Sequence, residues 1–219
     1  MKRYFIIGTD TDCGKTYVTC QLLDYFKKRG HRSFGIKPVA SGCLEQNNRL
    51  ISEDVVQLQQ HNGASQHDIC PWRFKPAISP HLAAEELGER LSAAAISNFC
   101  NDETFRDLDY LLIEGAGGLM VPLNNTETWV DFLNLSRIPV ILVVGMRLGC
   151  INHALLTAFA LKIHEISCVG WIANCIDEHM LALPGNITSL KEKMGLPLLA
   201  TIPYGGHIDN SAGIIQLLG

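Results

Sequence analysis

The residues with the clearest chemical purpose lie between positions 8 and 16 and read Gly-Thr-Asp-Thr-Asp-Cys-Gly-Lys-Thr. They follow a short apolar run and precede a helical pattern, which predicts a strand, a loop and a helix in that order. In such a loop the backbone N–H groups point at an anion, Lys15 supplies positive charge, and the Thr16 hydroxyl can bind Mg²⁺. Five residues, rather than the usual four, separate Gly8 from Gly14. The pattern predicts a nucleoside-triphosphate site, and the alternative is a glycine turn that only packs.

Two carboxylates are candidates for holding the Mg²⁺ that accompanies such a nucleotide. Glu114 follows the apolar run Tyr110–Ile113, which predicts an acidic residue at the tip of a buried strand. The glycine-rich residues 115–118 after it would let the backbone approach a phosphate closely. Asp54 offers a second carboxylate, and oxygen ligands of this kind suit magnesium. A solvated strand end and an ordinary acid at a helix N-terminus are the structural alternatives.

Lys37 follows the apolar residues Phe34–Ile36 and is followed by Pro38. The carboxyl ends of parallel strands meet at one edge of a sheet, so Lys37 is expected beside the phosphate loop. There a second lysine could neutralise charge spread over a transferring phosphoryl group, and Ser41 could hydrogen-bond a substrate. The alternative is a surface lysine.

Two further positions offer polar groups after predicted strands. The helix that begins near Gly149–Asn152 has unpaired N–H groups that would suit a carboxylate or a phosphate. Asn174 follows the run Cys168–Ala173, and its amide could donate to and accept from an adenine edge. Taken alone, a plain helix cap and a turn asparagine explain these residues at least as well.

Six short apolar runs would position these groups. Most lack polar alternation, as expected of strands buried on both faces of a parallel sheet. Helical patterns lie between several of them, over residues 15–29, 82–99 and 151–163, and the stretch 38–107 is a long crossover. Alternating strand and helix predicts an α/β fold of the P-loop NTPase type. We expect a single domain over residues 1–219, with one doubly wound, mostly parallel sheet flanked by helices. The six runs are Tyr4–Ile7, Phe34–Ile36, Tyr110–Ile113, Val140–Val144, Cys168–Ala173 and Leu198–Ile202.

Composition excludes several classes of protein. The 219 residues are 47% hydrophobic and 18% charged with a net charge of −4, which argues against disorder and against a basic nucleic-acid binder. The longest apolar run, Ile138–Met146, is shorter than the roughly 20 residues of a membrane span. The apolar start Tyr4–Ile7 is too short for a signal peptide, so a cytoplasmic protein is expected. The eight cysteines include no Cys-x-x-Cys pair, which favours reduced thiols over a disulfide scaffold or a zinc site.

Together these residues resemble one family closely, the dethiobiotin synthetases, ATP-dependent enzymes of the penultimate step of biotin synthesis. The matching segments run in the family order and cover the chain from residue 4 to about residue 205. The lysine motif and the Gly-Cys-Ile-Asn-His string are far more specific together than a lone phosphate loop. The matching segments are 8–16, 37–42, 79–84, 114–118, 144–153 and 171–174.

The resemblance implies a defined reaction. The substrates are 7,8-diaminononanoate, CO₂ and ATP with Mg²⁺. One amine captures CO₂ as a carbamate, and the carbamate oxygen attacks the γ-phosphate to form a carbamic-phosphoric anhydride. The second amine closes the ureido ring, releasing dethiobiotin, ADP and phosphate. Carbamate and γ-phosphate are both anions, so Lys15, Lys37 and Mg²⁺ would reduce their repulsion.

The resemblance also implies roles for individual residues. Thr16, Asp54 and Glu114 would bind Mg²⁺, while Thr11 and Ser41 would contact the carbamate end beside Lys15 and Lys37. The family is homodimeric, with its active site at the subunit interface, and the substrate carboxylate lies on the helix start Gly149, Cys150, Ile151 and Asn152 of the partner subunit. The residues expected around ATP are Asp12, Cys13, Gly14, Lys15, Thr16, Tyr17, Asp54, Glu114, Gly115, Ala116, Gly117, Asn174, Cys175, Pro203, Tyr204 and Gly205.

Two other functions compete with this interpretation. A related P-loop synthetase could act on another substrate, but amidotransferase-type members carry a glutaminase domain for which 219 residues leave little room. A dimeric switch ATPase of the ParA/MinD type would often carry an early second lysine in the loop, and residues 9–12 here are Thr-Asp-Thr-Asp. Such proteins also tend to have a membrane-binding tail or a basic surface, which the net charge of −4 does not favour.

Overall fold

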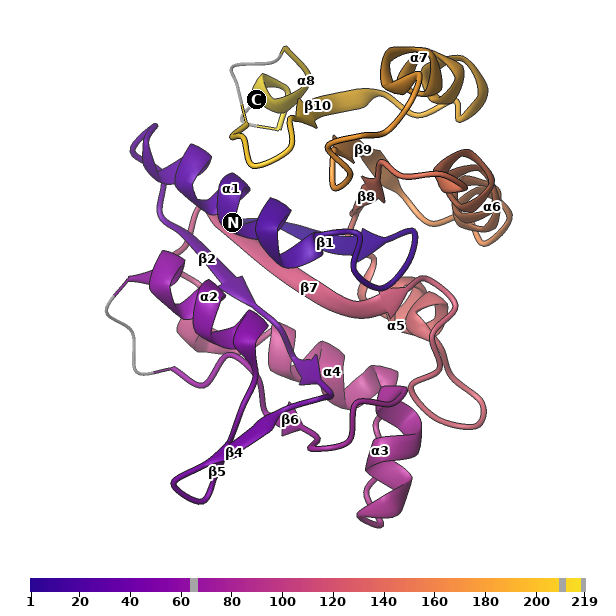
Figure 1. The fold of residues 1–219 in the computed structure, drawn as a ribbon. Coiled ribbons are helices and arrows are strands. Elements are labelled where there is room, and N and C mark those ends of the chain that lie inside the picture. The colour runs from indigo at the N-terminus through magenta and orange to yellow at the C-terminus, as the bar shows by residue number, and fades with distance from the viewer. Residues whose placement is uncertain (64–66, 209–211, 218–219) are drawn as a thin grey trace.

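A computed structural model describes residues 1–63, 67–208 and 212–217 (Figure 1). Within these residues the main sheet has six strands in the order β10-β9-β8-β1-β7-β2. Every pairing between neighbours is parallel, and β1 lies between β7 and β8. This confirms the expected α/β sheet and all six predicted strands. The strands are β1 (Lys2–Gly8), β2 (Ser33–Ile36), β7 (Tyr110–Gly118), β8 (Val140–Gly145), β9 (Cys168–Asn174) and β10 (Leu198–Ile202).

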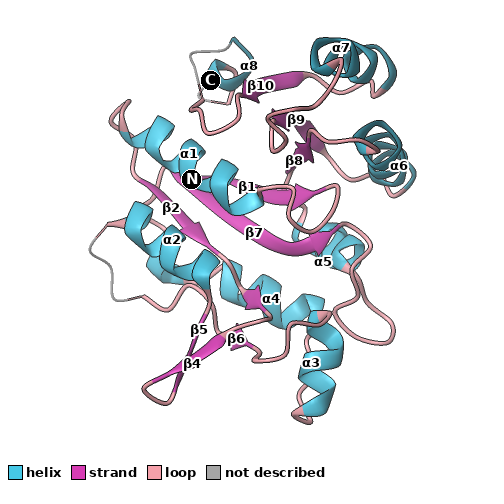
Figure 2. Ribbon diagram, viewed as in Figure 1, coloured by secondary structure: helices cyan, strands magenta, loops and turns pink. Residues whose placement is uncertain are grey.

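Helices cover the sheet on both faces. Figure 1 shows α1 and α2 in front of β2 and β7, with α4 and α5 behind them, and Figure 2 shows the same layers by element type. The helices are α1 (Lys15–Lys27), α2 (Glu53–Asn62), α3 (Pro80–Glu86), α4 (Ala93–Cys100), α5 (Trp129–Ser136), α6 (Cys150–Ile163), α7 (Leu183–Lys193) and α8 (Ala212–Ile215), with a short 3₁₀ helix at Glu103–Phe105.

The central strands are apolar on both faces because each face packs against a helix. On one face, the Phe5 ring lies 5.1 Å from the rings of Trp129 and Phe132 on α5. On the other, Phe26 of α1 stacks on Tyr110 at the start of β7, with ring centroids 4.2 Å apart. In a strand that is buried on both faces, no side chain points to solvent, so polar and apolar residues do not have to alternate. This explains the continuous apolar runs.

The predicted helix over residues 82–99 is wrong, because the structure divides this segment into α3 and α4. α3 ends at Glu86, and Gly88 then adopts a φ of +69°, a left-handed conformation that ends the helix. α4 starts afresh after Ser92, whose side chain accepts a hydrogen bond from the Ala95 N–H. The predicted helix over 15–29 also ends early, at Lys27, and Gly30 follows with a φ of +82°.

The long crossover between β2 and β7 carries α2, α3 and α4 and two small sheets. The strands β3 (Val39–Ala40) and β6 (Trp72–Arg73) pair in parallel, while β4 (Leu44–Gln46) and β5 (Arg49–Ile51) form an antiparallel hairpin. β3 carries the chain onward from Lys37 towards Ser41. All eight cysteines lie in the described residues and are free thiols. None of the described helices combines the length and the apolar character that a membrane crossing requires.

Candidate functional site

The phosphate loop has the predicted context, since β1 ends at Gly8 and α1 begins at Lys15. Gly14 immediately precedes the helix with a φ of +82°. A Cβ at Gly14 would lie 2.1 Å from the Asn174 Nδ2 atom, so both the backbone conformation and the available space require glycine. The first turn of α1 has no acidic side chain. The N–H groups at the start of α1 are therefore suited to a phosphate.

Contacts from neighbouring elements hold the loop in place. The Asn174 amide donates from Nδ2 to the Cys13 carbonyl at 3.0 Å, and the Lys15 ammonium donates to the Asp10 carbonyl at 3.1 Å. The Thr9 N–H donates to the carbonyl of Val143 in β8 at 3.0 Å. Asn174, expected at the adenine edge, thus lies against the phosphate loop and uses its amide nitrogen there.

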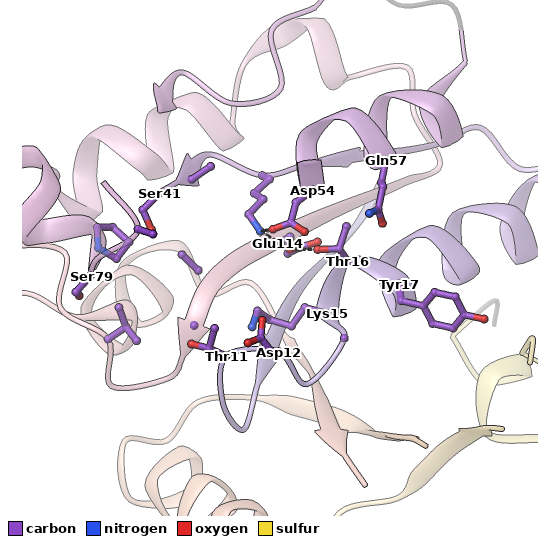
Figure 3. Close-up of a pocket in the computed structure, with 18 of the residues that line it drawn as sticks. Thr11, Asp12, Lys15, Thr16, Tyr17, Ser41, Asp54, Gln57, Ser79 and Glu114 are labelled. Carbon is purple, nitrogen blue, oxygen red and sulfur yellow. Dashed lines mark hydrogen bonds and ion pairs between the residues drawn. The ribbon is translucent and has the colours of Figure 1, made fainter. Parts of the chain in front are cut away.

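A cluster of charged side chains lies beside the loop, in which Lys37 and Glu114 are buried and Asp54 is 43% exposed (Figure 3). The Lys37 ammonium donates to Glu114 Oε1 at 2.7 Å and forms an ion pair with Asp54. The Thr16 hydroxyl donates to the same Glu114 oxygen at 2.7 Å. These four residues come from α1, the end of β2, α2 and β7. The structure therefore brings together the second lysine and all three predicted metal ligands.

The charges in this cluster stabilise one another. Burial alone would disfavour the Lys37 ammonium, but Glu114 and then Asp54 outweigh that effect and raise the pKa of Lys37 above its ordinary value. Burial would likewise raise the pKa of Asp54, but Lys37 and a hydrogen bond from Thr16 lower it below its ordinary value. Lys37 and Asp54 are therefore both ionised at neutral pH.

The cluster fits a magnesium ion that comes with a nucleotide. The Glu114 side chain is fully buried, and its Oε2 atom has no hydrogen-bond partner among the residues that the structure describes. That orphaned oxygen lies in the same cluster as the Thr16 hydroxyl and the Asp54 carboxylate, and such oxygen donors suit Mg²⁺. The ion typically binds through one or two carboxylates plus substrate phosphates, so no larger acidic cluster is needed.

The cluster opens into a cavity of about 720 Å³. Figure 3 shows Thr11, Asp12 and Lys15 below it, Ser41 to its left, and Asp54 and Glu114 above Lys15. Tyr17, Ala116 and Gly117 also line it. The cavity therefore brings the phosphate loop, the second lysine and both predicted carbamate contacts to one place.

Sequence reasoning missed several residues that line this cavity. Gln57 lies one helical turn after Asp54 on α2, so helical periodicity alone could have indicated it. Residues 77–79 from the loop before α3, Pro80 at the start of α3, and Val121 after β7 also line the cavity. Ser79 and Pro80 belong to the segment 79–84, which resembles the dethiobiotin synthetases.

The position of Glu114 differs from the prediction of a strand tip. β7 continues to Gly118, and Glu114 pairs with Ile6 inside the sheet. The Trp129 indole N–H donates to the Ala116 carbonyl at 2.9 Å, which anchors the backbone after Glu114. Because the strand does not end at Glu114, its carboxylate is buried rather than solvated.

The remaining predicted site residues lie outside the lining of this cavity. Cys13 is buried within the loop, Gly115 is buried in β7, and Cys175 is buried after β9. Pro203, Tyr204 and Gly205 are exposed after β10, although the Tyr17 hydroxyl donates to the carbonyl of the neighbouring Gly206. Gly149, Cys150 and Ile151 line a separate pocket of about 320 Å³, and Asn152 is exposed on α6.

A parallel sheet, a phosphate loop between β1 and α1, and a buried lysine–carboxylate cluster define a P-loop nucleoside-triphosphate-binding protein. The fold is similar to that of the septum site-determining protein MinD complexed with Mg-ADP from Pyrococcus horikoshii OT3. The TM-score is 0.56 at 17% identity, with 92% of this chain and 81% of the other covered. This likeness shows the fold alone.

Sequence comparison is more specific. An AAA domain family model matches residues 2–212. The chain is 54% identical to the ATP-dependent dethiobiotin synthetase of Legionella pneumophila (strain Paris), over 96% of this chain and 97% of the relative. It is 43% identical to that of Pseudoalteromonas translucida (strain TAC 125), over 93% and 91%. The chain belongs to the family of ATP-dependent dethiobiotin synthetases. The members of this family are ligases that form C–N bonds. This confirms the predicted family and favours it over the switch ATPase.

Proposed function

We propose that this protein carboxylates 7,8-diaminononanoate with CO₂ and closes the ureido ring of dethiobiotin, at the expense of Mg-ATP. The reaction passes through a carbamate and a carbamic-phosphoric anhydride, and releases ADP and phosphate. The whole chain, residues 1–219, acts as one synthetase domain in the cytoplasm. The observation that carries the proposal is the contact of Lys37 with Glu114 at 2.7 Å in a cavity that Thr11 and Ser41 also line.

Lys15 and Lys37 have the chemistry to bring two anions together. A carbamate and a γ-phosphate repel each other, and in a site of low dielectric constant that repulsion is large. Both lysine side chains are buried and both line the cavity. Fixed positive charges at the reacting oxygens stabilise the transition state without reorganising solvent.

Thr16, Asp54 and Glu114 would hold the Mg²⁺ ion, with the unpartnered Glu114 Oε2 as one available oxygen. When bound, the ion would neutralise charge on the phosphate oxygens. Asp12 and the residues up to Tyr17 would surround the phosphates at the start of α1.

Thr11 and Ser41 would bind the carbamate end of the substrate. They reach the cavity from different elements, Thr11 from the phosphate loop and Ser41 from the segment after β3. Two hydroxyl groups that approach from separate elements can fix the direction of attack on the γ-phosphate.

The adenine side would be formed by Asn174, Cys175 and the turn Pro203–Gly205. The Tyr17 hydroxyl donates to the Gly206 carbonyl, which ties this turn to the start of α1. The Cys175 N–H donates to the Ile202 carbonyl at 2.9 Å, so the two segments are held side by side. A nucleotide whose phosphates lie on α1 could therefore extend its base towards both.

The protein would act as a homodimer, in which residues Gly149–Asn152 of the partner subunit bind the substrate carboxylate. In this chain the start of α6 lies outside the main cavity, as a contribution to another subunit's site requires. α6 also exposes Leu156, Phe159 and Ile163, each more than half accessible. Their spacing places them along one side of the helix, an apolar face that a second subunit would cover.

Phosphate release from Mg-ATP and bicarbonate, measured with and without 7,8-diaminononanoate, tests the proposal. We expect release that depends on the diamine, together with a product whose mass corresponds to the diamine with one added carbonyl group. Release that is indifferent to the diamine would leave an ATPase site and refute the proposed substrate.

A further inference from the structure

Asp10 makes several contacts in the phosphate loop, and it is not among the predicted site residues. Its carbonyl accepts a hydrogen bond from Lys15 at 3.1 Å, and its Oδ1 atom accepts one from the backbone N–H of Thr11 at 2.8 Å. Its other oxygen, Oδ2, pairs with the Arg147 Nη2 atom at 2.6 Å. The His153 Nδ1 atom lies 3.9 Å from the same oxygen.

Arg147 belongs to a well-anchored segment between β8 and α6. Met146, directly before it, is fully buried, and its N–H donates to the Asn174 carbonyl at 2.7 Å. The Arg147 carbonyl accepts from the Cys150 N–H at 3.0 Å, at the beginning of α6. The backbone of Arg147 is therefore held in place on both sides, and its guanidinium extends from there to Asp10 in the phosphate loop.

We propose that Arg147 is a positioning residue for the synthetase reaction: through Asp10 it fixes the backbone of Thr11, so that the Thr11 hydroxyl faces the carbamate end of the substrate. This inference rests on the proposed function, because Thr11 matters only if a carbamate forms in the cavity. The link from Arg147 to Thr11 consists of two contacts, one at each oxygen of the Asp10 carboxylate.

The position of the pair indicates an effect on turnover rather than on folding. The side chains of Arg147 and Asp10 are 39% and 43% exposed, so solvent screens their attraction and the pair contributes little to stability. Thr11 is an exposed residue of the loop and lines the main cavity. A small displacement of a positioning group is enough to cost about a hundredfold in rate.

ATP binding should depend less on this pair. The phosphates would lie on the N–H groups at the start of α1 and on Lys15. Among the described residues the Arg147 side chain forms no hydrogen bond or ion pair with Lys15, and Asp10 binds Lys15 through its backbone carbonyl, which the side-chain substitutions retain. A substitution of Arg147 should therefore impair the positioning of the carbamate while leaving the binding of the nucleotide largely intact.

The test compares Arg147→Ala, Arg147→Lys, Asp10→Asn and the double variant Asp10→Asn/Arg147→Ala with the wild-type protein. The Arg147→Ala variant should lose at least tenfold in kcat for diamine-dependent phosphate release, while the Kd for ATP changes by less than about threefold. Arg147→Lys should recover most of the loss. The double variant should be no worse than the more impaired single variant, because both changes break the same link.

Arg106→Ala is the matched control, since Arg106 pairs with Glu103 at a site where both side chains are more than 70% exposed. It should match the wild-type protein in every measurement. Wild-type kcat in the Arg147→Ala variant, or losses that multiply in the double variant, would overturn the inference. A parallel fall of kcat, ATP affinity and Tm would also overturn it, as the sign of a merely structural role. Failure of the proposed function is distinguishable, because the wild-type protein itself would then show no dependence on the diamine.

Discussion

Replacing Lys37 with alanine removes the cation that pairs with Glu114 and Asp54 while leaving the phosphate loop unchanged. If this ammonium stabilises the transferring phosphoryl group, its loss should lower kcat by about 10²–10³-fold, the range found when one preorganised electrostatic donor is removed. ATP affinity should fall much less, because the nucleotide is held mainly by the loop and the start of α1.

The same substitution has a structural cost that must be separated from the catalytic one. Glu114 is fully buried, and in Lys37→Ala only the Thr16 hydroxyl would remain as a hydrogen-bond donor to it among the partners described. Removing one partner of a buried ion pair costs about 3–5 kcal/mol of stability, because the other charge stays buried without compensation. For a chain of this size that corresponds to a fall in Tm of about 6–20 °C.

The assay measures kcat for diamine-dependent phosphate release, the Kd for ATP by calorimetry, and Tm for each variant. The double variant Lys37→Ala/Glu114→Gln removes the uncompensated buried charge, so its Tm should recover while its kcat stays low. Lys75→Ala is the surface control, because Lys75 and Glu45 are 66% and 51% exposed, and this change should cost less than about 1 kcal/mol of stability.

Two results would refute this reasoning. An unchanged kcat in Lys37→Ala would show that the ammonium is not needed in the transition state. An ATP affinity that falls as far as kcat does would assign Lys37 to ground-state binding of the nucleotide instead.

The other predictions concern the helix start, the loop and the thiols. Asn152→Asp should raise the KM for the diamine several-fold at unchanged ATP affinity, because a new carboxylate would face that of the substrate; an unaffected KM would place the substrate carboxylate elsewhere. Gly14→Ala should abolish ATP binding in calorimetry, since its Cβ would lie 2.1 Å from Asn174 Nδ2 in a left-handed backbone conformation, and measurable binding at the wild-type Kd would contradict that geometry. Burial raises the pKa of the Cys70 and Cys100 thiols to about 12, so at pH 8 both should react with a thiol reagent only after unfolding; rapid labelling of either thiol in the native protein would be the opposite result.

The strands and the phosphate loop were predictable because their signals are local. An apolar run such as Val140–Val144 has few alternatives to a buried strand, and a Gly-Lys-Thr segment after such a run has few alternatives to an anion-binding turn. The family was predictable for a related reason, since several short strings in a fixed order are far more specific than any one of them.

Helix boundaries were less predictable from pattern alone. The periodic apolar residues in 82–99 are compatible with one helix, and the break depends on Gly88, whose left-handed conformation is only permitted, not required, by the residue type. The length of β7 shows the same limit. Glycine-rich residues after Glu114 favour a turn by composition, and Gly117 does adopt a left-handed φ of +67°. The strand nevertheless continues past this irregularity, because Gly118 pairs with Gly8 of β1 and the Ala116 carbonyl accepts a hydrogen bond from Trp129.

By itself, the sequence determined the order of the elements, the chemistry of the phosphate loop and the family to which the chain belongs. Only the tertiary structure decided that Lys37, Asp54 and Glu114 meet in one cluster, and that Asp10 connects Thr11 to Arg147. The physical reason is that residue type and spacing restrict the nearby backbone, whereas contacts between residues far apart in the chain depend on how the sheet and its helices pack together.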